Sequence, residues 1–535
     1  MTSTISPGTT RRLAVLAAVC MAALALPLAF SGGALATPAI GRDLGGSPIA
    51  MNWITNAFML AFGSLLMAAG TLADRFGRKR VFACGVAGFT LTSVALGFAP
   101  SIVVVDLLRA AQGVAAAAAL AGGTAALAQE FDGAARTSAF SALGTTFGIG
   151  LAFGPLLAGW LIAHFSWRAI FLAGAFAGVL SLGLGVPRMH ESRDPQARRF
   201  DWAGTVTFTA ALASFTCGVI EAPSRGWASA NVVALLAACV AFAIAFVIFE
   251  TRSPRPMLDL SLFRYPRFVG VQVLPIATCY CYIVLLVVLP LRFIGMDGYD
   301  EIHAGYLMLA LSAPMLFVPF VAAMLTRWMS AGVISGIGLV IAGAGLHTLG
   351  GALHAGVGPA VIGPMFVIGV GAGLPWGLMD GLSVSVVPKS RAGMATGIFG
   401  TTRVAGEGIA LAIVNALLAA LTQISLRAAV PHADSTDLSD AAARLSTGDL
   451  AHAATRLPDV PAATLQAAYH AAFGHLLDGL TAITLLCAFA VFAFLSRVRT
   501  QDEPVTTRTH DKRVSLDSPM VELAPRLIEL TDDKR

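Results

Sequence analysis

The chain has 535 residues, of which 56% are hydrophobic and only 12% are charged, and its mean hydropathy is +0.77. Soluble globular proteins carry about 25% charged residues, so this composition excludes a soluble enzyme and indicates a polytopic membrane protein. The formal net charge of +5 fits basic loops at a membrane. A nucleic-acid-binding surface is not expected, because no basic patch is interleaved with aromatic residues.

Fourteen apolar runs are long enough to cross the bilayer core, which takes roughly 20 helical residues. They cover residues 13–36, 51–69, 81–98, 102–128, 138–163, 169–186, 202–220, 232–249, 268–291, 304–325, 332–353, 359–387, 393–424 and 473–495. The first run follows Arg11 and Arg12 and imitates a signal peptide, but it is longer than the apolar part of one, so we expect an uncleaved helix. The predicted fold is an all-α polytopic membrane protein with 14 transmembrane helices.

A short, strongly charged loop at residues 70–80 separates the second and third runs. It reads Gly-Thr-Leu-Ala-Asp-Arg-Phe-Gly-Arg-Lys-Arg, and its cations are Arg75, Arg78, Lys79 and Arg80. Short basic loops between membrane helices stay in the cytoplasm, which places both termini there as well. Gly70 and Gly77 suit a tight turn, and Asp74 is expected to cap the start of the next helix. A positive-inside turn with no further role also explains this charge pattern.

Polar residues lie within the fourth run. Arg109 is inside the apolar span, with Asp106 one turn before it and Gln112 one turn after it. An Arg at the bilayer centre costs about 2.5–3.5 kcal/mol on insertion scales, so we expect it to face a partner or a water-filled cavity. It either orients the bundle as an internally paired residue or marks a pathway for ions or solutes.

The fifth run contains closely spaced small residues and a proline. They are Gly150, Gly154, Pro155 and Gly159, and Gly144 and Gly148 continue the small face. Glycines at this spacing let two helix backbones touch, and a proline removes one helix hydrogen bond and bends the helix. Ordinary close packing is a sufficient explanation on its own.

Two carboxylates in the last third of the chain are candidates for proton binding. Asp380 follows Pro375, where a bend can open the helix to water, and Glu407 lies four residues after Arg403, a spacing that predicts an ion pair on one helix face. A carboxylate that exchanges its ion-pair partner for a proton is a coupling device. A static, neutralised pair is the alternative interpretation.

Two wider connections divide the runs into six, two and six. We expect a first six-helix bundle at residues 1–187, an inserted two-helix hairpin at 188–267, a second six-helix bundle at 268–496 and a disordered cytoplasmic tail at 497–535. Within the second bundle, residues 425–472 form a polar external loop, in which we expect a short amphipathic helix on the surface. All seven cysteines lie in apolar runs, so neither a disulfide nor a metal site is expected.

These strings resemble the motifs of the major facilitator superfamily of transporters. G-x-L-A-D-R-x-G-R-K-R at residues 70–80 is similar to a loop that latches the cytoplasmic gate in that family, and R-x-x-Q-G from Arg109 is similar to a helix-4 motif whose Arg is implicated in proton transfer. G-x-x-x-G-P-x-x-A-G from Gly150 resembles the antiporter signature, a hinge and seal between the two bundles. With further strings at 166–171, 225–227 and 263–264, the chain resembles the fourteen-helix drug:proton antiporter group.

The resemblance implies a transporter of the bacterial inner membrane and not an enzyme. It implies export of drugs or amphipathic small molecules by alternating access, driven by an ion gradient, expected to be of protons, with no cofactor; no G-x-x-x-x-G-K-[ST] loop for ATP occurs. The protein is expected to work as a monomer in the lipid bilayer, with a periplasmic adaptor and an outer-membrane channel as further partners and with no nucleic acid.

One departure from the family pattern affects the coupling mechanism. Ala29 stands where the first helix of that group usually carries an acid, so proton coupling must use other carboxylates. The candidate coupling and cavity residues are Asp106, Arg109, Gln112, Asp380, Arg403 and Glu407. A dedicated exporter of a metabolite or siderophore, and a proton-independent facilitator, remain alternatives. An intramembrane enzyme or a receptor-like sensor would need a catalytic cluster or a large soluble domain, and the chain shows neither.

Overall fold

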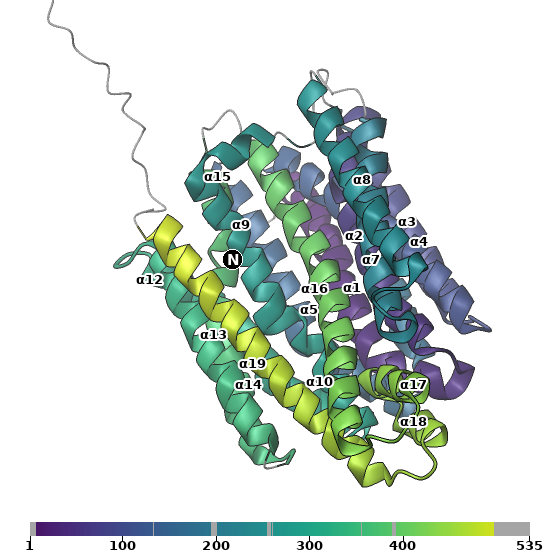
Figure 1. The fold of residues 1–535 in the computed structure, drawn as a ribbon. Helices are drawn as coiled ribbons and strands as arrows, with labels where there is room; N and C mark the ends of the chain where they lie inside the picture. The colour runs from purple at the N-terminus through teal and green to yellow at the C-terminus, as the bar shows by residue number, and fades with distance from the viewer. Residues whose placement is uncertain are drawn as a thin grey trace, which may run out of the picture. The chain divides into compact units, whose positions relative to one another are not determined.

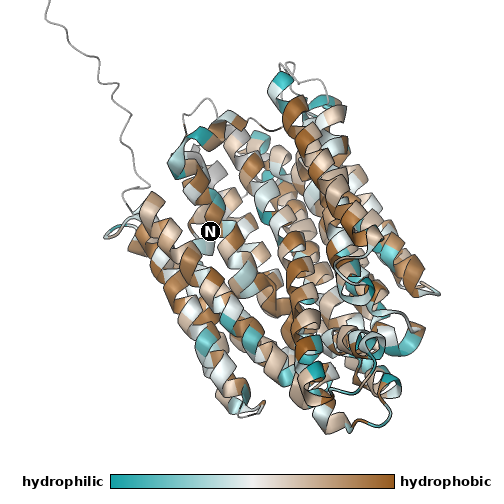
Figure 2. Cartoon of the chain, in the orientation of Figure 1, coloured by the Kyte–Doolittle hydropathy of each residue, from teal (hydrophilic) through white to brown (hydrophobic). Residues whose placement is uncertain are grey.

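The computed structural model describes residues 7–131, 133–193, 201–253, 258, 260–354, 356–387 and 392–496, and the predicted tail at 497–535 lies outside them. The described residues form helices and no strand (Figure 1). Fourteen helical segments are long and apolar enough to cross a membrane, which confirms the predicted number of spans. Hydrophobic residues run along these helices, and hydrophilic residues gather mainly near their ends (Figure 2).

The first bundle is formed by α1 (Pro7–Leu44), α2 (Pro48–Phe76), α3 (Arg78–Leu96), α4 (Ile102–Glu130), α5 (Gly133–His164) and α6 (Arg168–Gly185). Serine hydroxyls cap the starts of α2 and α4, where Ser47 accepts from the backbone N–H of Ala50 and Ser101 from that of Val104. α4 packs on α2 and α3, and α1 packs on α5 and α6. The short η1 (Val186–Arg188) follows α6.

Two inserted helices, α7 (Trp202–Arg225) and α8 (Ala230–Arg252), form a hairpin. α8 packs on α7, whereas α7 also packs on α2 and on α16 (Ala392–Ala429) of the second bundle. The inserted pair is therefore attached through α7 to both bundles at once. The short η2 (Leu260–Arg264) leads into the second bundle.

The second bundle has more broken helices than the first. Its elements are α9 (Pro266–Thr278), η3 (Cys279–Ile283), α10 (Leu285–Gly295), α11 (Glu301–Ser312), η4 (Ala313–Leu316), α12 (Val318–Leu325), α13 (Ala331–His354), η5 (Pro359–Val361), α14 (Ile362–Trp376), α15 (Met379–Ser385), α16 and α19 (Ala462–Leu495). Proline lacks the backbone N–H that a helix interior needs. Pro314 accordingly lies at the break between α11 and α12, and Pro375 at the end of α14.

The predicted external loop at residues 425–472 is largely helical. α16 continues to Ala429, α19 already begins at Ala462, and two short helices, α17 (Ser435–Ser446) and α18 (Leu450–Arg456), lie between them. The expected amphipathic helix is α17, whose apolar side is buried on α16. We call α17 and α18 together the cap. The membrane face on which they lie is called the cap side. The opposite face, at residues 70–80, is called the loop side.

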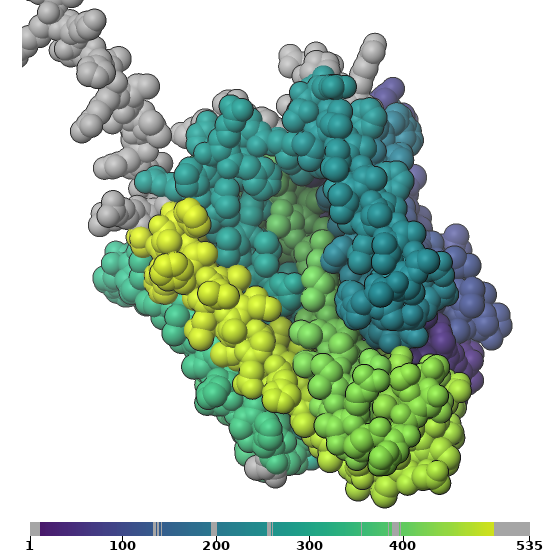
Figure 3. All heavy atoms as spheres, in the orientation of Figure 1, coloured from purple at the N-terminus to yellow at the C-terminus, as the bar shows by residue number. Residues whose placement is uncertain are grey.

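The two bundles meet along two seams. α5 packs on α11 along one seam, and α2 packs on α16 along the other, where Gly63 touches the backbone of Ala405 so closely that a side chain at Gly63 would not fit. On the loop side, α4 packs within the first bundle and α15 within the second. Figure 3 shows a recess on the loop side between α9 and α7, with α16 behind it. The bundles are thus packed together toward the cap side and separated by this recess toward the loop side, where the α2–α16 seam continues with Gly397 against Met67.

Candidate functional site

Arg109 is fully buried in the first bundle, where polar and aromatic groups contact it, including the ring of Phe171, whose centroid is 5.8 Å away. Its Nε donates to the carbonyl of Ile54 at 2.8 Å and its Nη1 to Oε1 of Gln112 at 2.6 Å, and its guanidinium lies over the ring of Phe58, 4.3 Å from the centroid. Gln112 in turn donates from Nε2 to the hydroxyl of Ser93 at 2.7 Å. A carbonyl dipole, an amide and an aromatic face therefore stabilise this cation in place of an ion pair.

The neighbours of Arg109 leave two polar groups unsatisfied. Nη2 of Arg109 has no hydrogen-bond partner and faces Gly33 of α1, where a Cβ would lie 3.1 Å from it. Asp106 is half-buried, and its Oδ1 also lacks a hydrogen-bond partner. Since Asp106 forms no ion pair within the described residues, the cation and the anion of the fourth span are both open to a further partner.

The second polar group lies in the second bundle, toward the loop side. Arg403 pairs with Asp380 at 3.5 Å, and its guanidinium lies 5.9 Å from the ring centroid of Trp376. The Asp380 side chain is 68% exposed and that of Arg403 20%, so solvent screens this pair. Asp380 is therefore an accessible carboxylate, as its position after Pro375 predicts.

The predicted ion pair between Arg403 and Glu407 is wrong. The guanidinium of Arg403 points to α14 and α15, where Trp376 and Asp380 lie, while Glu407 is half-buried one turn further along α16. η3 packs closely against α16 at this point, where the thiol of Cys279 lies 3.9 Å from the backbone carbonyl oxygen of Arg403. Glu407 has no ion-pair partner among the described residues, and the nearby charge of Arg403 acts on it only through space.

A π-helical turn interrupts the ninth span at η3, and the sequence analysis missed it. The turn places Tyr282 6.5 Å, centroid to centroid, from Trp376, and the phenol oxygen of Tyr282 is buried without a hydrogen-bond partner. π-turns often occur at functional sites. Pro275 and Pro290 on either side are the only local signal in the sequence, and they do not specify where the turn forms.

The loop at residues 70–80 differs from its prediction in two details. Asp74 lies in the last turn of α2 and pairs with Arg78 at 3.0 Å, so it does not cap α3, whose first turn has no side-chain cap. Gly70 lies in the helix with open space around it, whereas Gly77 has a φ of 116° and forms the turn. The turn closes at Gly77 because only glycine adopts that backbone conformation easily.

The other contacts of this loop stay within the first bundle. Arg78 donates to Gln129 at the end of α4, and its backbone N–H donates to the carbonyl of Ser192 at 3.0 Å. Arg80 pairs with Glu191 at 3.5 Å, while Arg75 is exposed and Lys79 is half-buried. The loop therefore has no partner in the second bundle among the described residues, in agreement with bundles that are apart on this side.

The small residues of α5 contact two different neighbours. Gly150 lies against Pro27 of α1, and Gly154 against Ser31 of the same helix. Gly159 lies against the backbone carbonyl of Glu301 in α11, with no space for a Cβ. One end of this motif thus packs within the first bundle and the other end packs across the seam. The backbone carbonyl of Pro155 faces Gly305 of α11, where an added Cβ would lie 3.1 Å from the carbonyl oxygen.

Ala29, which stands where the first helix of related transporters usually carries an acid, has apolar surroundings. Ala29 is 4% exposed and belongs to the main hydrophobic core. The structure therefore brings the candidate residues together in two groups, around Arg109 in the first bundle and around Arg403 in the second. It does not pair Asp106 with Arg109 or Glu407 with Arg403.

Comparison with known proteins identifies related chains of matching length. The chain is 32% identical over 400 residues to the multidrug resistance protein Stp of Mycobacterium tuberculosis, with 74% of each chain covered. It is 28% identical over 494 residues to the multidrug efflux pump LfrA of Mycolicibacterium smegmatis, covering 91% of this chain and 96% of that one. The tetracenomycin C resistance and export protein of Streptomyces glaucescens is 29% identical over 391 residues, with 72% of each chain covered.

Solved structures show the same fold at low sequence identity. A bacterial homologue of the human lysosomal transporter Spinster, in an inward-facing and unoccupied conformation, matches 94% of this chain with a TM-score of 0.62 and 15% identity. The family model described as Major Facilitator Superfamily matches residues 17–411. With this match over most of its length, and with fourteen spans, twelve of them in two contacting bundles, the chain belongs to the Major Facilitator Superfamily.

Proposed function

We propose that this protein is a secondary active exporter of drugs or amphipathic small molecules that works by alternating access and proton antiport. It acts in a bacterial inner membrane, with both termini in the cytoplasm, and it uses no cofactor. The names of the relatives support export, since they are called multidrug resistance, efflux and export proteins. The recess between the bundles on the loop side, opposite their packed cap side, supports alternating access.

One observation carries the proposal of proton coupling. Glu407 is half-buried in a membrane span and has no ion-pair partner in the described part of the chain. A charged, unpaired carboxylate is costly inside a membrane, so it is neutralised by binding either a proton or a cationic solute. Competition between those two occupants for one carboxylate is what antiport requires.

Asp380 and Arg403 have a supporting role in this proposal. Their exposed pair at 3.5 Å lies at the mouth of the second bundle on the loop side, where a proton can reach Asp380 from water. Protonation of Asp380 would free Arg403, which then remains over Trp376. Around Arg109, the unpaired Asp106 and Gln112 complete the polar lining that we propose for the first bundle.

The proposal is tested in proteoliposomes with an imposed pH gradient. A lipophilic cation such as ethidium is added, and substrate-evoked proton release is recorded for the unsubstituted protein and for Glu407→Gln and Asp380→Asn. We expect Glu407→Gln to abolish proton release while downhill ethidium movement persists. Glu221→Gln is the matched control, because Glu221 pairs with Arg225 within α7, away from the proposed pathway. Unchanged proton release in Glu407→Gln would remove this carboxylate from the coupling mechanism.

Two other functions have a specific observation in their favour. The buried, apolar Ala29 in place of an acid favours a proton-independent facilitator, for which substrate movement in all variants would ignore the pH gradient. Relatives named for the export of one compound, such as the cephamycin export protein CmcT of Amycolatopsis lactamdurans, favour a dedicated exporter of a metabolite or siderophore. Resistance to many unrelated compounds, or to one, separates these. Work as a monomer and assembly with a periplasmic adaptor and an outer-membrane channel stay predictions.

A further inference from the structure

A hydrogen bond between two asparagines joins the bundles on the cap side. Nδ2 of Asn415 in α16 donates to Oδ1 of Asn52 in α2 at 2.9 Å. Asn415 is 6% exposed, and its own Oδ1 has no other partner, so the side chain is held at this seam by the bond to Asn52. The backbone carbonyl of Asn52 also accepts a hydrogen bond from the side-chain amide of Asn56 at 2.9 Å. Breaking the bond without water nearby would leave buried polar groups unpaired, which makes closure on this side favourable.

Two elements outside the twelve bundle helices cover this bond. Asn52 and Asn415 line a small pocket whose other walls come from the end of α7, including Pro223, and from α17, including Ala443 and Ser446. The hydroxyl of Ser439 in α17 donates to the carbonyl of Pro223 at 3.0 Å, which ties the cap to the inserted helix. α7 and the cap therefore cover the asparagine pair in part, with Asn415 buried and Asn52 half-buried.

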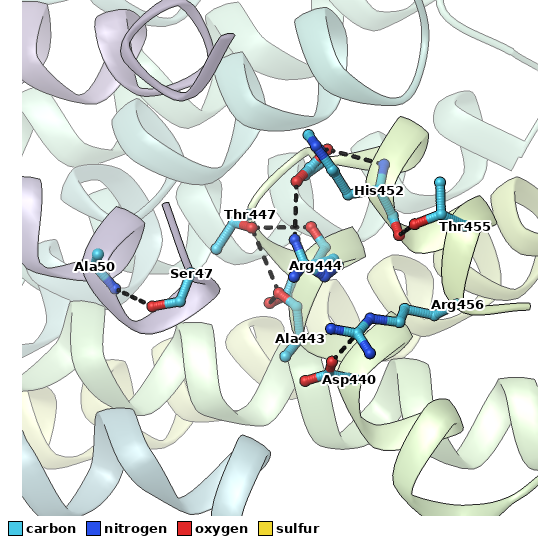
Figure 4. Close-up of polar contacts among 11 residues, drawn as sticks. Ser47, Ala50, Asp440, Ala443, Arg444, Thr447, His452, Thr455 and Arg456 are labelled. Carbon is cyan, nitrogen blue, oxygen red and sulfur yellow. Dashed lines mark hydrogen bonds and ion pairs between the residues drawn. The ribbon is translucent and has the colours of Figure 1, made fainter. Parts of the chain in front are cut away.

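The cap is itself held in shape by ion pairs. Figure 4 shows α17 and α18 joined through Arg444 and Asp449 and through Arg456 and Asp440, at 3.5 and 3.2 Å. The hydroxyl of Thr447 donates to the carbonyl of Arg444 at 2.9 Å at the turn that follows α17. A cap with these internal ties can act as a rigid cover over the seam.

A second polar contact crosses the other seam on the same side. Arg42 at the end of α1 donates to Glu301 at the start of α11. The backbone of Glu301 also carries the close contact with Gly159 of α5. The ion pair is partly exposed, because the side chain of Arg42 is 64% accessible, whereas that of Glu301 is 15% accessible. The two seams thus each have one polar tie between the bundles near the cap side.

We propose that Asn52–Asn415 and Arg42–Glu301 form a two-point latch that holds the cap side closed, and that α7 and the cap shield the asparagine point from water. Rocking of one bundle against the other must break both points together, since they join the same two rigid bodies. Asn52 and Asn415 are positioning residues in this scheme. They set the balance between the two conformations, whatever solute is moved, so the inference goes beyond the proposed export.

The test measures opening directly with a cysteine at Ala412. This residue is fully buried beside the asparagine pair, lines the same pocket and packs against α7 and α2, so it becomes reachable when α16 separates from these helices. Ala412→Cys is combined with Asn52→Ala, and the rate of labelling by a membrane-impermeant maleimide is followed in intact cells, with the chain lacking the new cysteine as background. We expect labelling to rise by about two- to tenfold, the shift that the net effect of one hydrogen bond gives.

Two further variants separate a rigid-body latch from local loosening. Arg42→Ala breaks the point on the other seam and should also raise labelling at residue 412, although it touches nothing near that residue. Asn52→Asp keeps an acceptor for the amide of Asn415 and should restore slow labelling. Arg168→Ala removes a partly exposed ion pair with Asp43 that lies within the first bundle, between α6 and the end of α1, and should change nothing.

The outcomes decide for or against the latch. Faster labelling in both Asn52→Ala and Arg42→Ala supports it. Faster labelling in Asn52→Ala alone indicates local loosening and overturns it, as does unchanged labelling in a well-folded Asn52→Ala protein. If Asn52→Ala is poorly folded by size-exclusion chromatography, Asn415→Ala removes the donor of the same hydrogen bond from the other helix and takes its place. The assay needs no substrate, so its failure is distinct from failure of the proposed export.

Discussion

At the scale of single residues, Arg109 is a buried cation whose hydrogen-bond donors have specific acceptors. The guanidinium donates at once to Ile54 and Gln112 from two different nitrogens, while lying over Phe58. A lysine ammonium is a point charge and does not reproduce that planar arrangement. The residue is thus specified by geometry as well as by charge.

We therefore expect Arg109→Lys to be destabilising although it keeps the positive charge. Leaving one buried acceptor unpaired costs about 1–3 kcal/mol. The thermal midpoint in detergent should fall, and transport should fall with it. Lys79→Arg, a swap of the same kind in the loop, is the control. An Arg109→Lys protein with an unchanged midpoint would show that the contacts to Ile54 and Gln112 contribute little.

Asp74 gives the opposite expectation, a loss of function at little cost in stability. Its side chain is 42% exposed, and its pair with Arg78 is an exposed i,i+4 pair, worth up to about 1 kcal/mol. Asp74→Ala should insert and fold normally but slow transport, because Asp74 is the only anion of a loop that is expected to act in the gate. Transport assays and membrane protein levels measure the two effects separately. Normal transport by a well-expressed variant would contradict the gate role.

At the scale of helices, the contact of α5 with α11 depends on one residue without a side chain. A Cβ at Gly159 would overlap the carbonyl of Glu301, whereas a Cβ at Gly144 on the same helix would meet nothing within 4 Å. We expect Gly159→Ala to hinder closure of the cap side and reduce transport at least several-fold, with Gly144→Ala close to normal. Maleimide labelling at residue 412 should rise in the first variant and not in the second. Equal behaviour of both variants would contradict a close seam at Gly159.

The start of α11 gives a prediction about pH. Asp300 caps this helix, and the hydrogen bond from the backbone N–H of His303 to its carboxylate lowers the pKa of Asp300 below 3.8. A lowered pKa contributes stability that is present above the unfolded value and is lost as pH falls through the folded value. Asp300→Ala should therefore cost about 0.5–2 kcal/mol near neutral pH, with a smaller difference below about pH 4. Thermal melting at pH 7 and pH 3.5 measures this, and a difference independent of pH would contradict a charged cap.

Helix number and helix breaks were not equally predictable. The fourteen spans follow from the sequence because a chain in lipid must satisfy its backbone within helices, which makes long apolar runs unambiguous. The amphipathic pattern predicted α17, whereas the π-turn at residues 279–283 and the second cap helix, α18, depend on packing between distant segments, which a run of apolar or polar residues does not encode.

The same limit explains the errors at the candidate site. The spacing of Arg403 and Glu407 is correct for an ion pair, but the aromatic ring of Trp376 and the carboxylate of Asp380 come from other elements and take the guanidinium instead. Arg109 was identified because a cation in an apolar run is anomalous by itself. Its acceptor, the carbonyl of Ile54, is a backbone group, and no side-chain pattern could reveal it.

At the scale of the whole molecule, the closed cap side and the open loop side give a prediction about labelling from two sides. Ser385 in α15 and Thr455 in α18 are both exposed, and both lie outside the seams. If both termini lie in the cytoplasm, as we propose, Ser385→Cys should react with an impermeant maleimide in everted vesicles and Thr455→Cys in intact cells. The reverse pattern would invert the proposed orientation while leaving the fold unchanged.

The packing of α7 on both α2 and α16 makes the two seams between the bundles unlike each other. An inserted span covers the α2–α16 seam, whereas no additional span in the described residues packs across α5 and α11. Lipid tails are therefore kept from the first seam but border the second. We therefore expect an apolar solute dissolved in the bilayer to reach the space between the bundles from one lateral direction, not from the two that a symmetrical twelve-helix arrangement would provide.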